Sequence, residues 1–454
     1  MFIEFQVKNF RSFRDLQKLT MRAAPLRPND NGMLEGNVFT SNNFRLLKTK
    51  AIYGGNASGK SNISRAFANF IRMIEDSVAI EKLPNFIWNQ RFLLGSDVDE
   101  PVSFQYIFLL NEKIYRYGFE IKNAIISNEW LFGGLDVNKE EKYFTREEGG
   151  LFIDKFLFKG AELYIDQALS AEGEVFRPDA LFLTGAALNN VKLAVEIRNA
   201  IKSIFTIDGI DDEAVMNVAM RYLDKAAHEQ RESFKKLLNV IDPGIVDFEL
   251  RDRLQPGFST EHSSVKPTSS TTTTTTTINP HANEKSKELY SIHSVFNDNG
   301  EITGRVAAPF SLWASQGTSR FFGIAALILQ SLNKGWPIVF DEFDARFHPN
   351  LTLKIVELFH STSTNPHNAQ LIFITHDTGL LRRAELRRDQ ICLVIKDRHG
   401  ISRLRTLIEY KGVRKDASYE KEYLQGNYGA TPYLDDMDLA IIQNLSAHGS
   451  TEAE

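Results

Sequence analysis

The sequence predicts an α/β fold in which a mixed, largely parallel sheet is combined with an antiparallel β-subdomain and a helical insertion. Three observations predict it. A strand, a glycine-rich turn and a helix follow one another over residues 49–75, β-rich runs adjoin over residues 102–132, and strands alternate with helices from residue 289. Alternation of strands and helices favours parallel pairing, whereas short turns between strands favour antiparallel pairing.

The composition is that of a large globular protein. Its 454 residues, 43% of them hydrophobic, suffice for a substantial core and more than one domain. No window approaches the roughly 20 apolar residues of a membrane span, and charges interrupt residues 1–22, where a signal peptide would be apolar. We therefore expect a cytoplasmic protein without a membrane partner.

Charge and cysteine content exclude further classes. The net charge of −5 argues against wholesale wrapping of nucleic acid but permits a local basic patch. The single cysteine, Cys392, lies in an apolar run that predicts a buried strand over residues 390–395. One thiol makes neither an internal disulfide nor a cysteine-based zinc site, so we assign it a structural role.

The first part of the fold, residues 1–180, combines a half-buried strand, a strand–loop–helix unit and the β-subdomain. Apolar and polar residues alternate over residues 2–10, and apolar residues recur at helical spacing over residues 62–75. The β-subdomain is predicted from three β-rich runs, residues 102–110, 113–121 and 125–132.

The second part, residues 181–288, predicts a helical insertion. Residues 186–205 and 211–240 have helical periodicity, but no heptad pattern is sustained over many turns, so we expect no long coiled-coil arms. Residues 253–287 include a threonine run at 271–277 and hold few large apolar side chains. They predict a disordered loop on the surface.

The third part, residues 289–454, completes the parallel sheet. Strands are expected at residues 289–296, 337–340 and 370–375, and helices at residues 317–332 and 351–359. Because these strands and helices alternate, we expect a largely parallel sheet.

The turn after residue 53 matches the phosphate-binding pattern G-x-x-x-x-G-K-[ST], and its position between a strand and a helix supports the match. Its residues, with the next one, are Gly54, Gly55, Asn56, Ala57, Ser58, Gly59, Lys60, Ser61 and Asn62. Glycines let backbone N–H groups approach phosphates, and the helix N-terminus adds its unpaired amides. We expect Lys60 to hold the β- and γ-phosphates of ATP, Ser61 to bind Mg²⁺, and Asn56 to lie beside the β–γ bridge.

Two later strands end in residues that would complete such a site. Asp341 and Glu342 follow an apolar strand, an arrangement in which the first carboxylate supports Mg²⁺ and the second orients the attacking water. His376 follows another apolar strand, residues 370–375. Taken alone, the acids could be a solvated pair at a strand end, and the histidine could be structural. The three strand ends together favour one site.

A further motif opens the helix at residues 317–332. Ser315-Gln316-Gly317-Thr318-Ser319-Arg320 places a serine and a glycine at a helix N-terminus, where they can cradle an anion. Because the phosphate loop already holds one side of the nucleotide, the anion would come from a second subunit. We assign Ser315, Gly317 and Thr318 to the nucleotide site, with an ordinary N-cap as the alternative.

With these motifs in order, the chain resembles ABC-type ATPase heads of the RecF, SMC and overcoming-lysogenization-defect group. It resembles more closely the bacterial AAA15-type ATPases of the abortive-infection AbiL, RloA and PARIS AriA kind. The passages that carry the resemblance are residues 5–13 with Lys-Asn-Phe-Arg-Ser-Phe, the phosphate loop, residues 315–320, residues 341–349, and the tail at residues 410–416 and 423–430. The resemblance implies an ABC-ATPase head, a His376 that contacts the γ-phosphate or the attacking water, and a homodimer, with or without further assembly, that ATP bridges.

Some positions depart from the family pattern or leave it open. Ala314 stands where an acidic residue often precedes the serine, and both Gln90 and Gln105 are candidates for the Q-loop glutamine. These departures bear on the rate of hydrolysis rather than on ATP binding. For Asp344 we weigh a D-loop contact across a dimer against an N-cap.

The resemblance implies a phage-defence function, in which the ATPase scaffolds and restrains a separately encoded effector, often a Toprim-type nuclease, until a phage trigger protein appears. The stretch after His376 is short for an additional nuclease domain, so we expect the effector on another chain. The alternative is a RecF- or SMC-like repair ATPase acting directly on DNA, which basic pairs at residues 382–383 and 387–388 permit. A transporter subunit is disfavoured, because the β-subdomain is foreign to that class.

Overall fold

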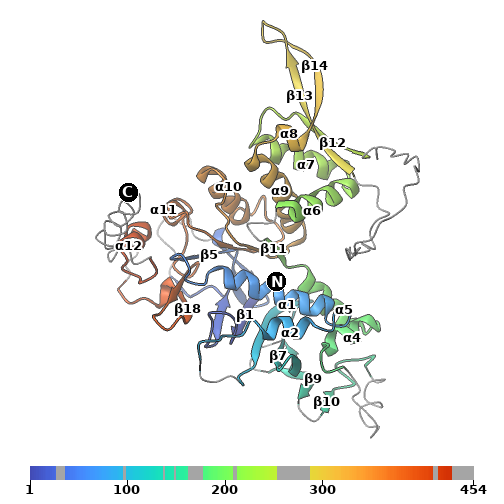
Figure 1. The fold of residues 1–454 in the computed structure, drawn as a ribbon, viewed down its shortest axis with the longest axis vertical. Coiled ribbons are helices and arrows are strands. Elements are labelled where there is room, and N and C mark those ends of the chain that lie inside the picture. The colour runs from blue at the N-terminus through green and yellow to red at the C-terminus, as the bar shows by residue number, and fades with distance from the viewer. Residues whose placement is uncertain are drawn as a thin grey trace, which may run out of the picture. The chain divides into compact units, whose positions relative to one another are not determined.

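The computed structural model of the chain contains a six-stranded, mainly parallel sheet (Figure 1). Its strands lie in the order β11 (Phe205–Ile207), β15 (Ile338–Phe340), β16 (Leu371–Ile374), β5 (Thr49–Gly54), β17 (Ile391–Lys396) and β18 (Ser402–Thr406). The first five are parallel, and β18 pairs antiparallel with β17. Every residue of β15, β16 and β5 is buried, as expected for parallel strands covered on both faces.

The chain divides into two units. The structure describes residues 1–26, 36–95, 99–135, 139–147, 150–161, 177–207, 212–252, 287–412 and 418–431. The first unit comprises residues 1–210 and 330–454, and the second comprises residues 211–329. This division differs from the predicted parts. Residues 181–210 belong with the sheet because β11 pairs with β15, and residues 289–329 belong to the insertion because β13 (Lys287–Phe296) pairs with β12 (Asp247–Asp252).

The predicted β-subdomain is a seven-stranded antiparallel sheet in the first unit. Its order is β10 (Gly150–Ile153), β9 (Glu141–Glu147), β8 (Ile125–Gly134), β7 (Lys113–Lys122), β6 (Val102–Leu110), β1 (Phe2–Lys8) and β2 (Gln17–Thr20). A two-residue turn joins β6 to β7, and Asn111 and Glu112 both take left-handed φ angles there, of 48° and 63°. A separate hairpin pairs β3 (Val38–Ser41) with β4 (Phe44–Leu47).

Helix α1 (Ser61–Asp76) packs against both large sheets of the first unit. Its Phe67 stacks on Phe5 with ring centroids 4.0 Å apart, and its Phe70 stacks on Phe119 at 5.6 Å. Residues of β5, β15 and β16 belong to the same core cluster. Each buried phenylalanine contributes about 2–3 kcal/mol by its area alone, so this aromatic packing holds the start of α1 in place.

Shorter helices complete the first unit. They are α2 (Leu83–Trp88), α4 (Phe182–Leu188), α5 (Lys192–Lys202), α10 (Pro349–His360), α11 (Gly379–Arg383), the 3₁₀ turn η2 (Leu407–Glu409) and α12 (Tyr419–Leu424). The helical periodicity of residues 186–205 is therefore divided between α4 and α5. It breaks where Asn190 takes a left-handed φ of 61°, which asparagine tolerates, and it stops before the β-branched run that forms β11.

The second unit contains the part of the predicted helical insertion that begins at residue 211. It holds α6 (Asp212–Lys225), α7 (His228–Asn239), the sheet β12–β13–β14, with β14 at Ile302–Pro309, then α8 (Phe310–Trp313) and the start of α9 (Gln316–Lys334). The rings of Phe234, Phe248, Phe310 and Phe322 pack together at its centre. No helix in the described ranges is longer than the 19 residues of α9, which agrees with the predicted lack of coiled-coil arms. The loop predicted at residues 253–287 lies, except for Lys287, outside the described residues.

None of the helices that the structure describes is long and apolar enough to cross a membrane.

A network of hydrogen bonds surrounds the amino-terminal end of β5. The Nε2 atom of His360 lies 2.8 Å from the hydroxyl of Thr49, and Nε2 of Gln390 donates to that hydroxyl at 2.7 Å. The ammonium of Lys48 donates to the backbone carbonyl of His360 at 2.9 Å. Burial of the ring, and secondarily the positive charge of Lys48, lowers the pKa of His360 from 6.5 to about 4.

This lowered pKa predicts a loss of stability in mild acid. The unfolded chain binds the proton of His360 below about pH 6.5, while the folded chain excludes it until about pH 4. As the pH falls from 7 to 4.5, this one group should therefore lower the unfolding free energy by on the order of 2 kcal/mol. In urea titrations, His360→Gln should lose correspondingly less stability over that range. Equal losses in the two proteins would contradict the assignment.

Candidate functional site

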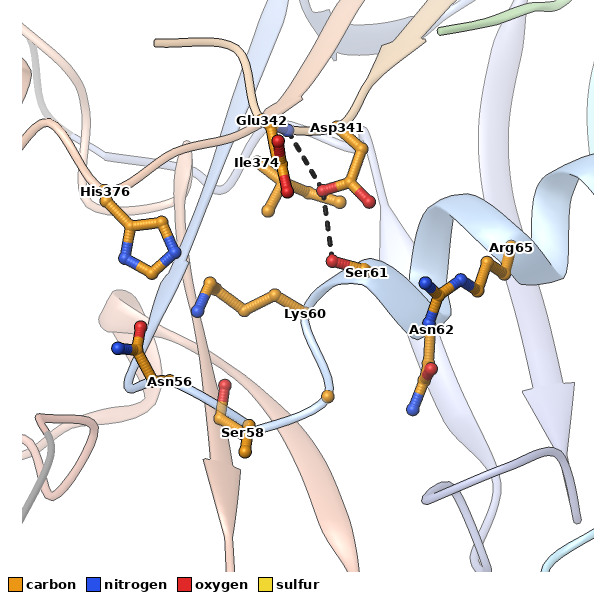
Figure 2. Close-up of a pocket in the computed structure, with 12 residues that line it drawn as sticks. Asn56, Ser58, Lys60, Ser61, Asn62, Arg65, Asp341, Glu342, Ile374 and His376 are labelled. Atoms are coloured by element: carbon orange, nitrogen blue, oxygen red, sulfur yellow. Dashed lines mark hydrogen bonds between the residues drawn. The ribbon is translucent and has the colours of Figure 1, made fainter. Parts of the chain in front are cut away.

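Three neighbouring strands of the parallel sheet end at one edge. Leu371 of β16 pairs with Ile338 of β15 on one side and with Thr49 of β5 on the other. The residues that follow these strands consequently line one cavity of about 380 Å³ (Figure 2). Its lining consists of residues 56–62 and Arg65 from the loop and α1, Asp341 and Glu342 after β15, and Ile374 and His376 from β16 and the residues after it.

The glycine-rich loop folds around its own lysine. The Nζ atom of Lys60 donates to the carbonyl oxygens of Gly54 and Gly55, at 2.7 and 2.8 Å. Ala57 and Gly59 take left-handed φ angles of 59° and 99°. A Cβ atom at Gly59 would lie only 2.5 Å from Oγ of Ser12, so this position requires glycine for space as well as for its backbone.

Two serines from distant parts of the chain hold the loop from behind. The hydroxyl of Ser402 donates to the carbonyl of Ser58 at 2.5 Å, and its oxygen lies 2.8 Å from Oγ of Ser12. The side-chain amide of Asn62 also donates to Oγ of Ser12, at 2.8 Å. The hydroxyl of Ser58 itself is buried and has no hydrogen-bond partner within the described part of the chain.

The N-terminus of α1 lies directly after the glycine-rich loop. No side chain caps this helix, and its first turn contains no acidic residue. The first N–H groups of a helix lack partners inside the helix and carry the positive end of its dipole. An uncapped N-terminus beside a glycine-rich loop is therefore suited to an anion such as a phosphate.

The two acids after β15 have different surroundings. Asp341 is buried, and its Oδ1 atom accepts a hydrogen bond from Oγ of Ser61 at 3.3 Å and from the N–H of Glu342 at 3.0 Å. Glu342 is exposed at the cavity and has a left-handed φ of 50°. That conformation is costly for a residue with a long side chain, and such strain concentrates at functional sites.

A third acid holds the segment that carries His376. The Oδ1 atom of Asp344 accepts hydrogen bonds from the hydroxyl of Thr375, at 2.7 Å, and from the N–H of His376, at 3.0 Å. The N-cap of α10 is His348, so the N-cap alternative for Asp344 is wrong. Partial burial and then the charge of Lys60 lower the pKa of His376, more than Asp344 and Glu342 raise it, so its ring is neutral at pH 7.

Burial also acts on the loop lysine. Removal from water lowers the pKa of Lys60 from 10.5 to about 8, although Asp341 and Asp344 oppose this shift. Its ammonium is thus charged at neutral pH, but only by a narrow margin. A bound anion would favour the charged form.

The motif at residues 315–320 lies in the second unit. Oγ of Ser315 accepts a hydrogen bond from the N–H of Thr318 at 3.0 Å, and the hydroxyl of Thr318 donates to Asp242 at 3.3 Å. Ser315 thus has the geometry of an N-cap for α9. Ser315, Gly317 and Thr318 are not among the residues that line the cavity, and neither are Gly54 and Gly55 of the loop. The other predicted residues, 56–62, Asp341, Glu342 and His376, line it.

The structure adds residues that the motifs did not indicate. Arg65 lines the cavity and stands four residues after Ser61, so helical spacing offered a signal for it. Ser402 had no such signal, because only the fold brings it to the loop. Neither Q-loop candidate lines the cavity. Gln90 accepts a hydrogen bond from Arg11, and Gln105 accepts from Arg116 and Trp130.

The glycine-rich loop between β5 and α1 and the cavity that it lines define a P-loop protein. Residues 51–382 match the family described as "AAA domain, putative AbiEii toxin, Type IV TA system", and the chain belongs to this family. Among solved structures it is similar to the "SMC head domain from Thermotoga maritima", with 15% identity over 89% of this chain and 98% of that one and a TM-score of 0.40. No curated protein matches the sequence.

The pKa of Lys60 predicts how nucleotide affinity depends on pH. Above about pH 8 the free protein loses the ammonium charge that would attract a phosphate. Affinity for ADP should therefore fall about tenfold between pH 7 and pH 9 in isothermal titrations. Lys60→Arg, whose guanidinium stays charged, should show a flat profile over the same range. An unchanged affinity of the original protein at pH 9 would contradict this role of Lys60.

Proposed function

We propose that the chain binds ATP with Mg²⁺ in this cavity and hydrolyses the γ-phosphate bond. The observation that carries the proposal is the convergence of three strand ends on one cavity, which brings Lys60, Glu342 and His376 to the same space (Figure 2). The family match, which covers most of the chain, supports the same activity.

The phosphate groups would be held by the loop. The uncapped N–H groups of α1 and the ammonium of Lys60 supply positive charge, and the buried hydroxyl of Ser58 supplies a donor that lacks a partner in the described residues. Desolvated, charge-assisted hydrogen bonds to phosphate are among the stronger contacts available to a protein. These groups would orient the triphosphate with its γ-phosphate towards Glu342.

Ser61 and Asp341 fit a magnesium ion. Both offer oxygen atoms, and these atoms lie 3.3 Å apart. Octahedral Mg²⁺ with ligands at about 2.1 Å places adjacent oxygens about 3 Å apart, and it commonly binds proteins through one or two side chains plus phosphates and waters. When bound, the ion would neutralise charge on the β- and γ-phosphates.

Glu342 and His376 have the properties that hydrolysis requires. The carboxylate of Glu342 is exposed to the cavity and would orient the attacking water and accept its proton. The neutral ring of His376 would donate a hydrogen bond to the γ-phosphate or to that water. The hydrogen bonds from Thr375 and the His376 backbone to Asp344 fix the segment from which the ring projects.

We further propose that ATP bridges two copies of the chain. The N-terminus of α9, with Ser315, Gly317 and Thr318, would contact the γ-phosphate held by the partner's loop. A bridge of this kind closes the dimer when ATP binds and releases it after hydrolysis. The bound nucleotide would then decide whether partner proteins encounter a closed dimer or separate subunits.

The biological setting that we propose is anti-phage defence by abortive infection. The resemblance to AAA15-type ATPases and the family description, which names a toxin–antitoxin system, both support it. In this proposal the ATP-bound assembly scaffolds and restrains an effector nuclease encoded nearby, until a phage trigger releases it.

Two substitutions separate binding from hydrolysis. Lys60→Ala removes the charge that meets the phosphates and should weaken ATP binding by about a hundredfold. Glu342→Gln should bind ATP normally while hydrolysing it about 10²- to 10⁴-fold more slowly, and light scattering should then show a persistent dimer. Equal ATP affinity in both variants would refute the assignment of Lys60, and undiminished turnover in Glu342→Gln would refute that of Glu342.

The effector role is tested by affinity purification of Glu342→Gln after co-expression with its genomic neighbours. We expect a stable complex that contains a nuclease-like protein and that is lost in Lys60→Ala. If the purified protein is instead a bare dimer that binds DNA only with ATP, and does so less tightly at higher salt, the repair alternative replaces this role.

A further inference from the structure

Arg65 is an exposed cation at the edge of the cavity. It stands on the face of α1 that also carries Ser61, and its side chain is among those that line the cavity. Figure 2 shows Arg65 beside Asn62, with Ser61 and Lys60 between these two residues and His376. Within the described part of the chain, no carboxylate forms an ion pair with Arg65.

A second guanidinium lies near the first. Arg11 takes a left-handed φ of 52°, and its Nε atom donates to the side-chain oxygen of Gln90 at 2.9 Å. Its backbone N–H also donates to the carbonyl of Gln90, at 2.7 Å. Partial burial, followed by the positive charge of Arg65, lowers the pKa of Arg11. A neutral glutamine thus holds Arg11 where it is within range of the charge of Arg65.

Two neighbouring cations without an acid are unfavourable in the free protein. Like charges repel, and a surface arginine usually gains from a carboxylate partner where one is near. The arrangement becomes favourable when an anion enters between or beside the two groups. The guanidinium of Arg65 offers paired donors that match the oxygens of a phosphate.

The direction of the triphosphate identifies that anion. Glu342 and His376 mark the end of the cavity where the γ-phosphate would react, and Ser61 with Asp341 marks the metal position. Arg65 lies on the other side of Ser61 (Figure 2). We propose that Arg65 binds the α-phosphate of the nucleotide at the point where it leaves the loop, an inference that rests on the proposed function.

The test compares three probes that differ in length. Affinities for ATP, inorganic tripolyphosphate and pyrophosphate are measured by isothermal titration with Mg²⁺ at pH 7. Arg65→Ala should weaken ATP and tripolyphosphate about tenfold, because both reach the third phosphate position, and should change pyrophosphate by less than about twofold. Arg65→Lys, which keeps a charge at this position, should recover most of the lost affinity.

A matched control comes from the same helix. Arg72 is an exposed arginine of α1 that lies over the ring of Phe86, 5.6 Å from its centroid, and does not line the cavity. Arg72→Ala should leave all three affinities unchanged, which excludes a general effect of charge. Thermal melts of the free variants should match the original protein, because Arg65 is exposed and unpaired among the described residues.

Each outcome decides the inference. Unchanged ATP affinity in Arg65→Ala would overturn it, and so would a loss for ATP without a loss for tripolyphosphate, which would place Arg65 on the nucleoside. A failure of the proposed function looks different. In that case the original protein binds no ATP, or Lys60→Ala binds it equally well.

Discussion

The parallel pairing of β15, β16 and β5 is the constraint on which the site depends. Because these strands run in one direction and in matched register, the phosphate loop, the acid pair and His376 emerge at the same edge. Parallel strands must be covered on both faces, and all the residues of these three are buried. A strand reversed within this set would move one of the three parts of the candidate site to the opposite end of the sheet.

Helix α1 converts that arrangement into a rigid anion site. Its aromatic side chains pack into the core shared with the antiparallel sheet, so its N-terminus cannot shift without breaking contacts such as that between Phe67 and Phe5. This packing offsets the cost of leaving the first N–H groups without a side-chain cap. The serine contacts behind the loop, from Ser12 and Ser402, add a second restraint from other parts of the chain.

Glu342 and His376 are positioned by backbone geometry as much as by hydrogen bonds of side chains. Glu342 keeps a left-handed backbone, while Phe343 next to it is fully buried and its N–H donates to the carbonyl of Ile374 at 2.9 Å. Asp344 then binds Thr375 and the backbone of His376. One short segment therefore sets the positions of both Glu342 and His376. A displacement of either residue would displace the other.

The sequence by itself determined the local elements and the loop. Helical and alternating periodicities predicted α1, β6, β7, β8, β15, β16 and β17, because burial of one face or of a whole strand leaves a pattern in nearby residues. The loop motif, the acid pair and the histidine were likewise local signals, and the structure brings them to one cavity. Their roles follow from chemistry that short motifs carry.

Tertiary structure alone decided which distant residues meet. The helical pattern of residues 186–205 gives way to strand β11 at Phe205 because that segment pairs with β15, an interaction between residues far apart in the chain. Ser402 reaches the loop only because β18 folds beside β17, and the charge of Arg65 acts on Arg11 only because α1 packs against the N-terminal strand. Such contacts depend on chain topology and packing, which leave no periodic pattern in the residues that make them.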